Sequence, residues 1–316
     1  MIRLPSPFSW LSPAGPRGGL SIFIFHRVLE TPDPLLPDVP DAAQFARIAS
    51  FLASYFSVLP LSEAAERLAA GTLPAAAACI TFDDGYRDNL TVAAPILRRH
   101  DLPASLFVAT AFLDGHCMWN DVVIEAIRAA PAGTLDLQDL GLGSIQIGDA
   151  ASRVTTYQQL LLQLKYLEVG DRLERATEIA RRAGLGSLTG LMLDPTELRP
   201  LRGQGWEIGG HTVSHPILAR LDDASALREI GEGRERLTAL LGEAPSTFAY
   251  PNGVPGVDFT DRDVALVRRA GFAVAVTTAP GANRRGIDPL RLKRFTPWDQ
   301  AMTRFGARCA LNLMRR

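Results

Sequence analysis

The chain has 316 residues, 47% hydrophobic and 21% charged, a composition that excludes intrinsic disorder for most of its length. Its 33 basic and 34 acidic residues leave a net charge of −1, so no general attraction to nucleic acid or anionic lipid is indicated. No stretch reaches the ~20 apolar residues that a membrane-spanning helix needs.

The first 19 residues are read as an N-terminal extension that carries no secretion signal. Four prolines interrupt every apolar run there, whereas a signal peptide needs about 7–15 uninterrupted apolar residues. The three cysteines, Cys79, Cys117 and Cys309, are widely spaced and odd in number, which argues against a disulfide framework. These features predict a cytoplasmic protein.

Strands and helices are predicted to alternate from residue 20 onward. Short apolar runs predict strands, and apolar residues spaced three and four apart predict helices. The first half carries expected strands at 20–26, 57–60, 78–82 and 104–109, with helices at 41–56, from 62, and at 87–100. Such alternation is typical of a parallel α/β sheet.

The stretch 116–200 interrupts this rhythm and is predicted to be a mainly helical insertion. It contains expected helices at 120–130, 157–168 and 171–184, with a small hairpin at 140–149. The alternation then resumes with strands at 206–209, 246–250, 273–277 and 290–295 and helices at 222–241, 260–270 and 297–316. We therefore expect one distorted (β/α) barrel domain over 20–316 that carries the insertion, although the length alone would also allow two domains.

Two adjacent carboxylates follow the expected strand at 78–82, in the sequence Thr81-Phe82-Asp83-Asp84-Gly85. Neighbouring carboxylates repel one another, and a bound cation would resolve the conflict, with one carboxylate as ligand and the other as a free base. A glycine after them allows a tight turn. An ordinary Asp-Asp-Gly turn before a helix is the alternative interpretation.

Two of the five histidines, His211 and His215, follow the expected strand at 206–209. One helical turn would bring residues four apart to the same side, a recurring spacing of zinc ligands, although surface or capping histidines would look the same. Together with one carboxylate they form a three-ligand set, which is the composition of a catalytic rather than a structural zinc site. Both motifs lie at the carboxyl ends of strands, where barrel enzymes place their chemistry.

The segments TFDDGY, HTVSHP and YPNG resemble the motifs of polysaccharide deacetylases with a NodB-homology domain, carbohydrate esterase family four. The resemblance covers roughly residues 20–296 apart from the insertion. It implies a distorted (β/α) barrel, a bound divalent metal, and removal of acetyl groups from N-acetylated sugars. Zinc is the favoured metal, with cobalt or another divalent ion as the alternative.

The resemblance also implies roles for single residues. Asp83 would be the general base, and Asp84, His211 and His215 would hold the metal. The third motif, which includes Pro251 and Gly253, would line one side of the groove, and the backbone N–H of Tyr250 would hold the oxyanion.

Two departures from the family pattern stand out in this sequence. Ala249 occupies the position of an arginine that orients the catalytic aspartate, and Arg294 is the candidate substitute. No histidine follows His215, so the usual C-terminal general acid is missing. His26 is predicted to fill that role, because a subgroup of the family carries the acid histidine on an N-terminal strand. A histidine hydrogen-bonded under a loop is the alternative.

These inferences predict a hydrolase that deacetylates an N-acetylated sugar or glycan intermediate. Trp119, Trp298 and Tyr250 are candidates for stacking on sugar rings, each with an equally good core role. The helix at 297–316 is expected to pack on the barrel or to touch a membrane surface. The alternatives are a metal-dependent hydrolase of non-sugar amides and a sugar-binding relative that has lost catalysis.

Overall fold

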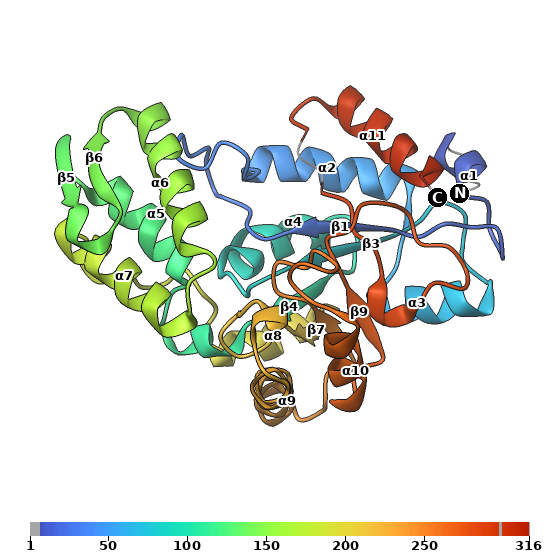
Figure 1. Cartoon of the computed structure of the whole chain (residues 1–316). Helices are drawn as coiled ribbons and strands as arrows, with labels where there is room; N and C mark the ends of the chain where they lie inside the picture. Colours follow the sequence, from blue (N-terminus) through green and yellow to red (C-terminus); the bar gives the residue numbers. More distant parts are fainter. Residues whose placement is uncertain (1–6, 297–298, 316) are drawn as a thin grey trace.

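The computed structural model describes residues 7–296 and 299–315. Its centre is a seven-stranded parallel sheet in the order β1-β3-β4-β7-β8-β9, with β2 paired to the start of β3 (Figure 1). The strands are β1 (Ser21–Phe25), β2 (Ser57–Val58), β3 (Ala77–Phe82), β4 (Ser105–Val108), β7 (Glu207–Gly210), β8 (Thr247–Ala249) and β9 (Val274–Val276). The expected α/β fold with parallel strands is therefore confirmed.

Helices connect successive strands, as the pattern predicted. They are α2 (Ala42–Tyr55), α3 (Leu61–Ala70), α4 (Ala94–Arg98), α8 (Leu198–Gly203), α9 (Asp223–Leu241) and α10 (Asp261–Arg269). The helix expected at 87–100 begins as a π-helical turn, Asn89–Ala93, before α4 continues it. Asp41 caps α2 by accepting the Gln44 N–H, in agreement with its predicted capping role.

The segment 292–295 closes the sheet into a distorted barrel. Leu292 bridges to Val276 of β9, and Phe295 bridges to Phe23 of β1, so this segment joins the two edge strands. The prediction of a strand at 290–295 is partly wrong. Residues Pro289–Arg291 form a 3-10 turn, and within 292–295 there are only the two isolated bridges. Pro289 has no N–H, and the Asp288 carboxylate accepts the N–H of Leu290, which favours the turn over a ladder.

Both faces of the sheet are buried, which explains the continuous apolar strands. Every residue of β1 and β3 is buried. Phe23 and Phe25 point into the core cluster that α2 covers, whereas Ile22 joins a second cluster with α3 and Phe107. This alternation along one strand is the two-residue period of β-structure.

The insertion folds around its own apolar core at one side of the barrel (Figure 1). It contains α5 (Trp119–Ala129), β5 (Gly133–Leu137), β6 (Gly143–Ile147), α6 (Ala150–Leu164) and α7 (Val169–Arg182). The antiparallel hairpin β5–β6 is longer and earlier than the one expected at 140–149. Asp149 caps α6 by accepting the Ser152 N–H, so this helix begins seven residues before the expected 157.

Both ends of the insertion are bonded to the turn that follows β3. The Leu193 N–H donates to the Gly85 carbonyl, and the Arg87 N–H donates to the Leu191 carbonyl, at 2.9 and 2.8 Å. The Tyr86 hydroxyl donates to the Asp121 carboxylate of α5 at 3.1 Å. The Asp-Asp-Gly-Tyr turn therefore contains two candidate site residues and also anchors the insertion through hydrogen bonds.

Two terminal helices, α1 (Pro7–Leu11) and α11 (Met302–Met314), contact each other beside α2. Phe305, Cys309 and Leu313 of α11 are buried in the main barrel core, so the apolar face of this helix packs on the barrel. Trp298 lies outside the described residues, and contact of 297–316 with a membrane stays a prediction. No helix in the described part of the chain is both long and apolar enough to cross a bilayer.

Candidate active site

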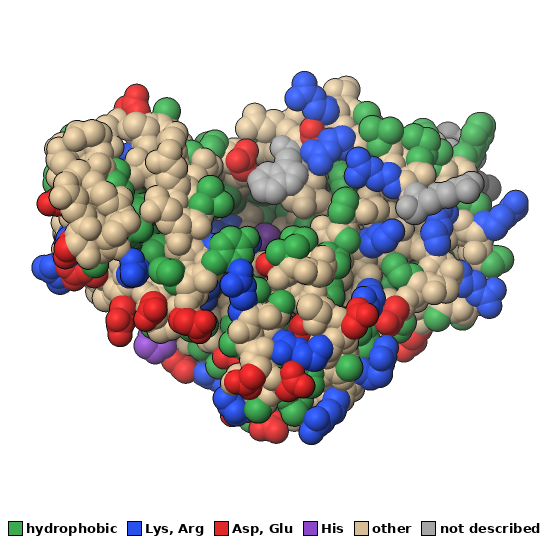
Figure 2. Space-filling view, viewed as in Figure 1, with side chains coloured by type: hydrophobic (Ala, Val, Ile, Leu, Met, Phe, Trp, Pro, Cys, Tyr) green, Lys and Arg blue, Asp and Glu red, His purple; other side chains and the backbone are tan. Residues whose placement is uncertain are grey.

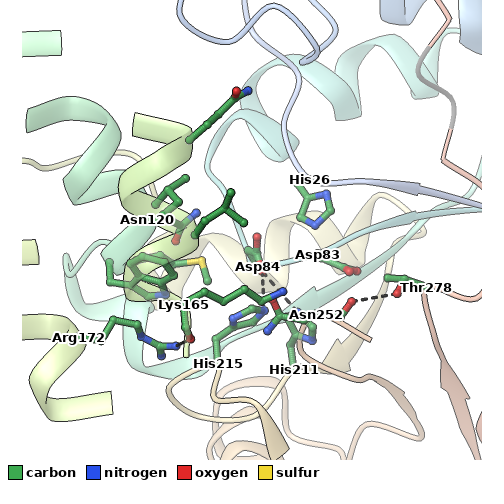
Figure 3. A pocket seen from close by; sticks show the side chains of 15 residues that line it. His26, Asp83, Asp84, Asn120, Lys165, Arg172, His211, His215, Asn252 and Thr278 are labelled. Atoms are coloured by element: carbon green, nitrogen blue, oxygen red, sulfur yellow. Dashed lines mark hydrogen bonds and ion pairs between the residues drawn. The ribbon is translucent and has the colours of Figure 1, made fainter. Parts of the chain in front are cut away.

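The carboxyl ends of four strands meet at one pocket of about 520 Å³ (Figure 3). His26 follows β1, Asp83 and Asp84 follow β3, and His211 follows β7, while a loop after β8 contributes Asn252. In Figure 2 the pocket is the hollow between the insertion and the barrel, and a histidine side chain is visible within it. The expected convergence of the two motifs is therefore present in the fold.

Backbone strain is concentrated around this pocket. Six non-glycine residues of the described chain have a left-handed φ, and four of them are Asp84, Thr212, His215 and Asn252. Each such residue costs about 1–3 kcal/mol, so the surrounding structure must enforce these conformations. Asp84 has φ 76° and is followed by Gly85 at 94°, and this double left-handed turn separates the two neighbouring carboxylates.

Asp84, His211 and His215 form the candidate metal centre. One Asp84 oxygen, Oδ1, lies 3.4 Å from Nε2 of His211 and 3.6 Å from Nε2 of His215. The same oxygen is buried and has no hydrogen-bond partner among the described residues. A buried carboxylate oxygen without a partner is costly, and a cation between the three ligand atoms would satisfy it. The three side chains thus fit a divalent metal.

Neighbouring groups orient the histidines for this role. Nδ1 of His211 lies 2.7 Å from the Ala249 carbonyl, a contact in which the ring donates, so that Nε2 is left as the ligand atom. Burial lowers the pKa of His215 to about 3, helped by His211, so this ring is neutral at physiological pH. Burial also disfavours the charged form of His211, but Asp84 and Asp83 outweigh it and raise the pKa of that ring.

The HTVSHP segment is a loop, and the expected helical turn between its histidines is wrong. Thr212 and His215 have φ values of 66° and 55°, which no right-handed helix contains. Glu229 of α9 holds the loop by accepting the N–H groups of Val213 and Ser214, both at 2.9 Å. The sequence carried no signal for Glu229, because a glutamate on a polar helix face looks like any solvated residue.

Arg294 binds Asp83 through two parallel hydrogen bonds, both 2.7 Å long. The guanidinium also donates to the Thr277 carbonyl at 2.9 Å, and both charged side chains are fully buried. Burial alone would raise the pKa of Asp83, but Arg294 outweighs burial and lowers it. Asp83 is therefore held as a carboxylate with a fixed orientation, by the arginine that was expected to replace the one missing at Ala249.

His26 lines the pocket with an exposed side chain directly after β1. Figure 3 shows its ring on the same side of the pocket as Asp83. The Asn89 side chain donates to the His26 carbonyl at 2.8 Å and so fixes the backbone, while the ring itself is solvent-accessible. The alternative of a histidine tucked under a loop does not fit this exposure.

Tyr250 is placed differently from the expectation. Its N–H donates to the Val276 carbonyl at 3.2 Å, its hydroxyl donates to the Leu290 carbonyl, and its buried ring stacks on Phe259. Because the N–H is used by the sheet and the ring faces the core, Tyr250 offers neither the oxyanion donor nor a sugar platform. Tyrosine at a strand end is ambiguous in sequence, since its ring serves a core as well as a groove.

Asn252, two residues after Tyr250, lines the pocket instead. Its backbone N–H has no hydrogen-bond partner within the described residues, and Thr278 holds the loop by donating its hydroxyl to the Asn252 carbonyl at 3.0 Å. Gly253 has φ 74°, and a Cβ there would lie 3.0 Å from Thr278 atoms, so only glycine fits. Buried Pro251 precedes them in the same turn.

The insertion supplies the opposite wall of the pocket, where the sequence had singled out only Trp119 as a candidate. Its lining side chains are Met118, Trp119, Asn120, Gln158, Leu161, Leu162, Lys165 and Arg172. Trp119 was a candidate for sugar stacking and does line the pocket, with Arg172 over its ring at 4.9 Å. Helical periodicity marks the buried face of a helix but does not show which polar residues face a neighbouring site.

A family model described as polysaccharide deacetylase matches residues 70–275, well over half of the chain. The chain belongs to the polysaccharide deacetylase family. Solved structures show the same fold at low identity, including IcaB from Ammonifex degensii, at TM-score 0.61, 17% identity, and coverage of 96% of this chain and 98% of that one. The Streptococcus pyogenes deacetylase PplD in complex with acetate is similar at TM-score 0.60 and 18% identity, over 88% and 92% of the two chains.

A de-N-acetylase from Aggregatibacter actinomycetemcomitans also shares the fold, at TM-score 0.56 and 14% identity, over 91% of this chain and 99% of that one. Curated relatives match less of the chain. A phosphoglucosamine mutase from Herminiimonas arsenicoxydans is 27% identical in an alignment of 163 positions that covers 43% of this chain. The chain matches only 36% of that protein's length, so its activity says nothing about this member of the deacetylase family.

Proposed function

We propose that the protein is a metal-dependent hydrolase that removes acetyl groups from an N-acetylated sugar or glycan intermediate. The observation that carries this proposal is the placement of Asp83 beside the three-ligand cluster. One carboxylate is fixed by a buried arginine, while its neighbour Asp84 lies with His211 and His215 in the same pocket. Pure binding of a sugar does not require a second, oriented carboxylate next to a metal.

Asp84, His211 and His215 would hold the ion. When bound there, a divalent metal would lower the pKa of water and polarise the acetamide carbonyl. Zinc is favoured by the two histidine ligands, with cobalt as the alternative.

The chain's own groups then account for the proton transfers. Asp83, ionised because Arg294 lowers its pKa, takes the proton from the attacking water. The Asn252 N–H, which has no acceptor among the described residues, is the proposed donor for the developing oxyanion in place of Tyr250. His26 gives a proton to the leaving amine nitrogen. The products are acetate and the free amino sugar.

The test compares Asp83→Asn with Asp84→Asn in the zinc-loaded protein. Acetate release from N-acetylglucosamine oligomers should fall by about 10²–10⁴-fold in Asp83→Asn, because a positioned base is lost. Zinc titration should show unchanged stoichiometry for that variant and loss of the site for Asp84→Asn. His100→Gln, outside the pocket, is the control and should keep the full rate.

Three outcomes would contradict the proposal in different ways. Full activity of Asp83→Asn would remove the assigned base. Hydrolysis of simple acetamides but not of acetylated sugars would indicate a non-sugar amidase. A chain that binds sugar but neither takes up zinc or cobalt nor releases acetate would be a binding protein.

A further inference from the structure

Two cationic side chains of the insertion line the pocket without an acidic partner. Lys165 follows the end of α6, and Arg172 lies on the first turn of α7. Figure 3 shows both side chains extending from the insertion toward the barrel residues of the site. No Asp or Glu of the described chain forms an ion pair with either of them.

Arg172 is only 4% exposed, which is unusual for an arginine without a carboxylate. The only hydrogen bond of its side chain within the described residues is donated to the Lys165 carbonyl at 3.3 Å, and its guanidinium lies over the Trp119 ring. Burial lowers the pKa of Arg172, and no neighbouring acid opposes that effect. Within the described part of the chain, four of the five guanidinium N–H donors therefore have no acceptor.

The other buried arginine of the site shows what a completed pair looks like. Arg294 is 1% exposed and shares two short hydrogen bonds with Asp83. The pocket's other acid, Asp84, belongs to the histidine cluster. Neither carboxylate is thus available to Arg172 or Lys165, and the wall formed by the insertion carries two uncompensated positive charges.

We propose that Arg172 and Lys165 form a subsite for an oxyanion, so that the substrate is an N-acetylated sugar bearing a phosphate or carboxylate group. This inference rests on the proposed function for the acetyl group and adds the chemistry of the rest of the substrate. A guanidinium presents paired donors that match either oxyanion, and an ammonium adds a second point charge. Asn120 lines the same wall with a buried, unpartnered Oδ1, which suits a sugar hydroxyl or amide donor.

The first test measures binding to the metal-free protein, so that an oxyanion cannot gain affinity by ligating the metal. Calorimetry would compare N-acetylglucosamine 1-phosphate and N-acetylmuramic acid, which carry the two oxyanions, with neutral N-acetylglucosamine. At least one anionic sugar should bind about tenfold or more tightly than the neutral one, since charged hydrogen bonds contribute about 1.5–3 kcal/mol each. The stronger of the two identifies phosphate or carboxylate as the natural group.

The variants Arg172→Gln and Lys165→Gln should each remove most of this preference. Arg172→Gln removes a buried charge that has no acidic partner among the described residues, so its thermal midpoint should change little. Arg175→Gln is the matched control: Arg175 is on the same helix and binds the Leu140 carbonyl, away from the pocket. It should bind all three sugars like the wild type. If Arg172→Gln does not fold, the binding preference of Lys165→Gln tests the oxyanion subsite instead.

The outcomes separate this inference from the proposed function. Equal binding of neutral and anionic sugars, or a preference that survives both substitutions, would overturn the oxyanion subsite, whether or not the zinc-loaded protein releases acetate. A preference that depends on Arg172 in a chain that releases no acetate from any of the three sugars would support the subsite and count against the deacetylase.

Discussion

The barrel and the insertion meet at one pocket but differ in whether their charged side chains there have partners. On the barrel side, Asp83 is paired with Arg294 and Asp84 with two histidines. On the insertion side, Lys165 and Arg172 face the same space without an acid. The barrel therefore brings an oriented carboxylate together with a candidate metal site in which one Asp84 oxygen is left for a cation, whereas the insertion presents positive groups that only an anionic ligand could complete.

The two regions also have separate cores. The insertion core, which includes Val123, Leu160 and Ile179, shares no residue with the clusters around the sheet. Changes in one wall of the pocket can therefore be expected to leave the other wall's packing in place. The following predictions test this division, from the largest expected effect on stability to the smallest.

Removing Arg294 should damage the barrel most. Arg294→Met leaves the buried Asp83 carboxylate unpaired, which should cost about 3–5 kcal/mol in the free energy of unfolding, measured with denaturant in the metal-free protein. The double variant with Asp83→Asn should recover a large part of that loss. A cost below about 1 kcal/mol for the single change would contradict the structural importance of the pair.

Leu160→Ala should destabilise the insertion by about 2–5 kcal/mol, since Leu160 is fully buried in its core. If the two cores are independent, zinc affinity of the barrel should stay within about twofold of the wild type. Hydrogen exchange should show the loss of protection over 119–182 and not over the strands. A parallel loss of zinc binding would mean that the insertion supports the metal ligands after all.

Asp121, at the junction of the two regions, should make stability depend on pH. Burial raises the pKa of Asp121 to about 7, while Arg27 opposes the shift. Its ordinary pKa is 3.8, so its stabilising contribution is complete below about pH 4 and is lost as pH rises through 7.

Asp121→Asn should remove this loss of stability at high pH. The free energy of unfolding of the variant, relative to that of the wild type, should rise by roughly 2 kcal/mol between pH 5 and pH 8. Urea unfolding at the two pH values measures this difference. Glu174→Gln, at an exposed position of α7, serves as the control. A pH-independent difference for Asp121→Asn would show that this carboxyl does not titrate as its burial implies.

The barrel was predictable from the sequence to a larger extent than the pocket. Apolar runs such as ACITF and the repeated strand-helix order were enough to predict the sheet. Two motifs were enough to predict that Asp83, Asp84, His211 and His215 lie close together. Arg294 was expected on Asp83 because the family resemblance left the position of the orienting arginine to Ala249, and Arg294 lies at the end of a late predicted strand. These features depend on local pattern and on the common edge of a parallel sheet.

The parts that escaped prediction depend on backbone conformation and on packing between distant segments. The histidine loop was expected to be helical, because the left-handed φ of Thr212 and His215 is imposed by Glu229 and other neighbours rather than by the local sequence. Tyr250 was assigned to the groove, whereas Asn252 occupies it. Lys165 and Arg172 line the pocket because of the way the insertion packs against the barrel, and no local sequence pattern predicts that packing.

The turn after β3 has a consequence for selectivity. Gly85 and Arg87 hydrogen-bond to the returning end of the insertion, and Tyr86 holds its first helix through Asp121. The contacts that hold this wall of the pocket therefore lie within four residues of Asp84, a candidate metal ligand. Under the proposed function, loosening the Tyr86–Asp121 contact should accordingly change which substrates enter before it changes how fast the acetyl group leaves.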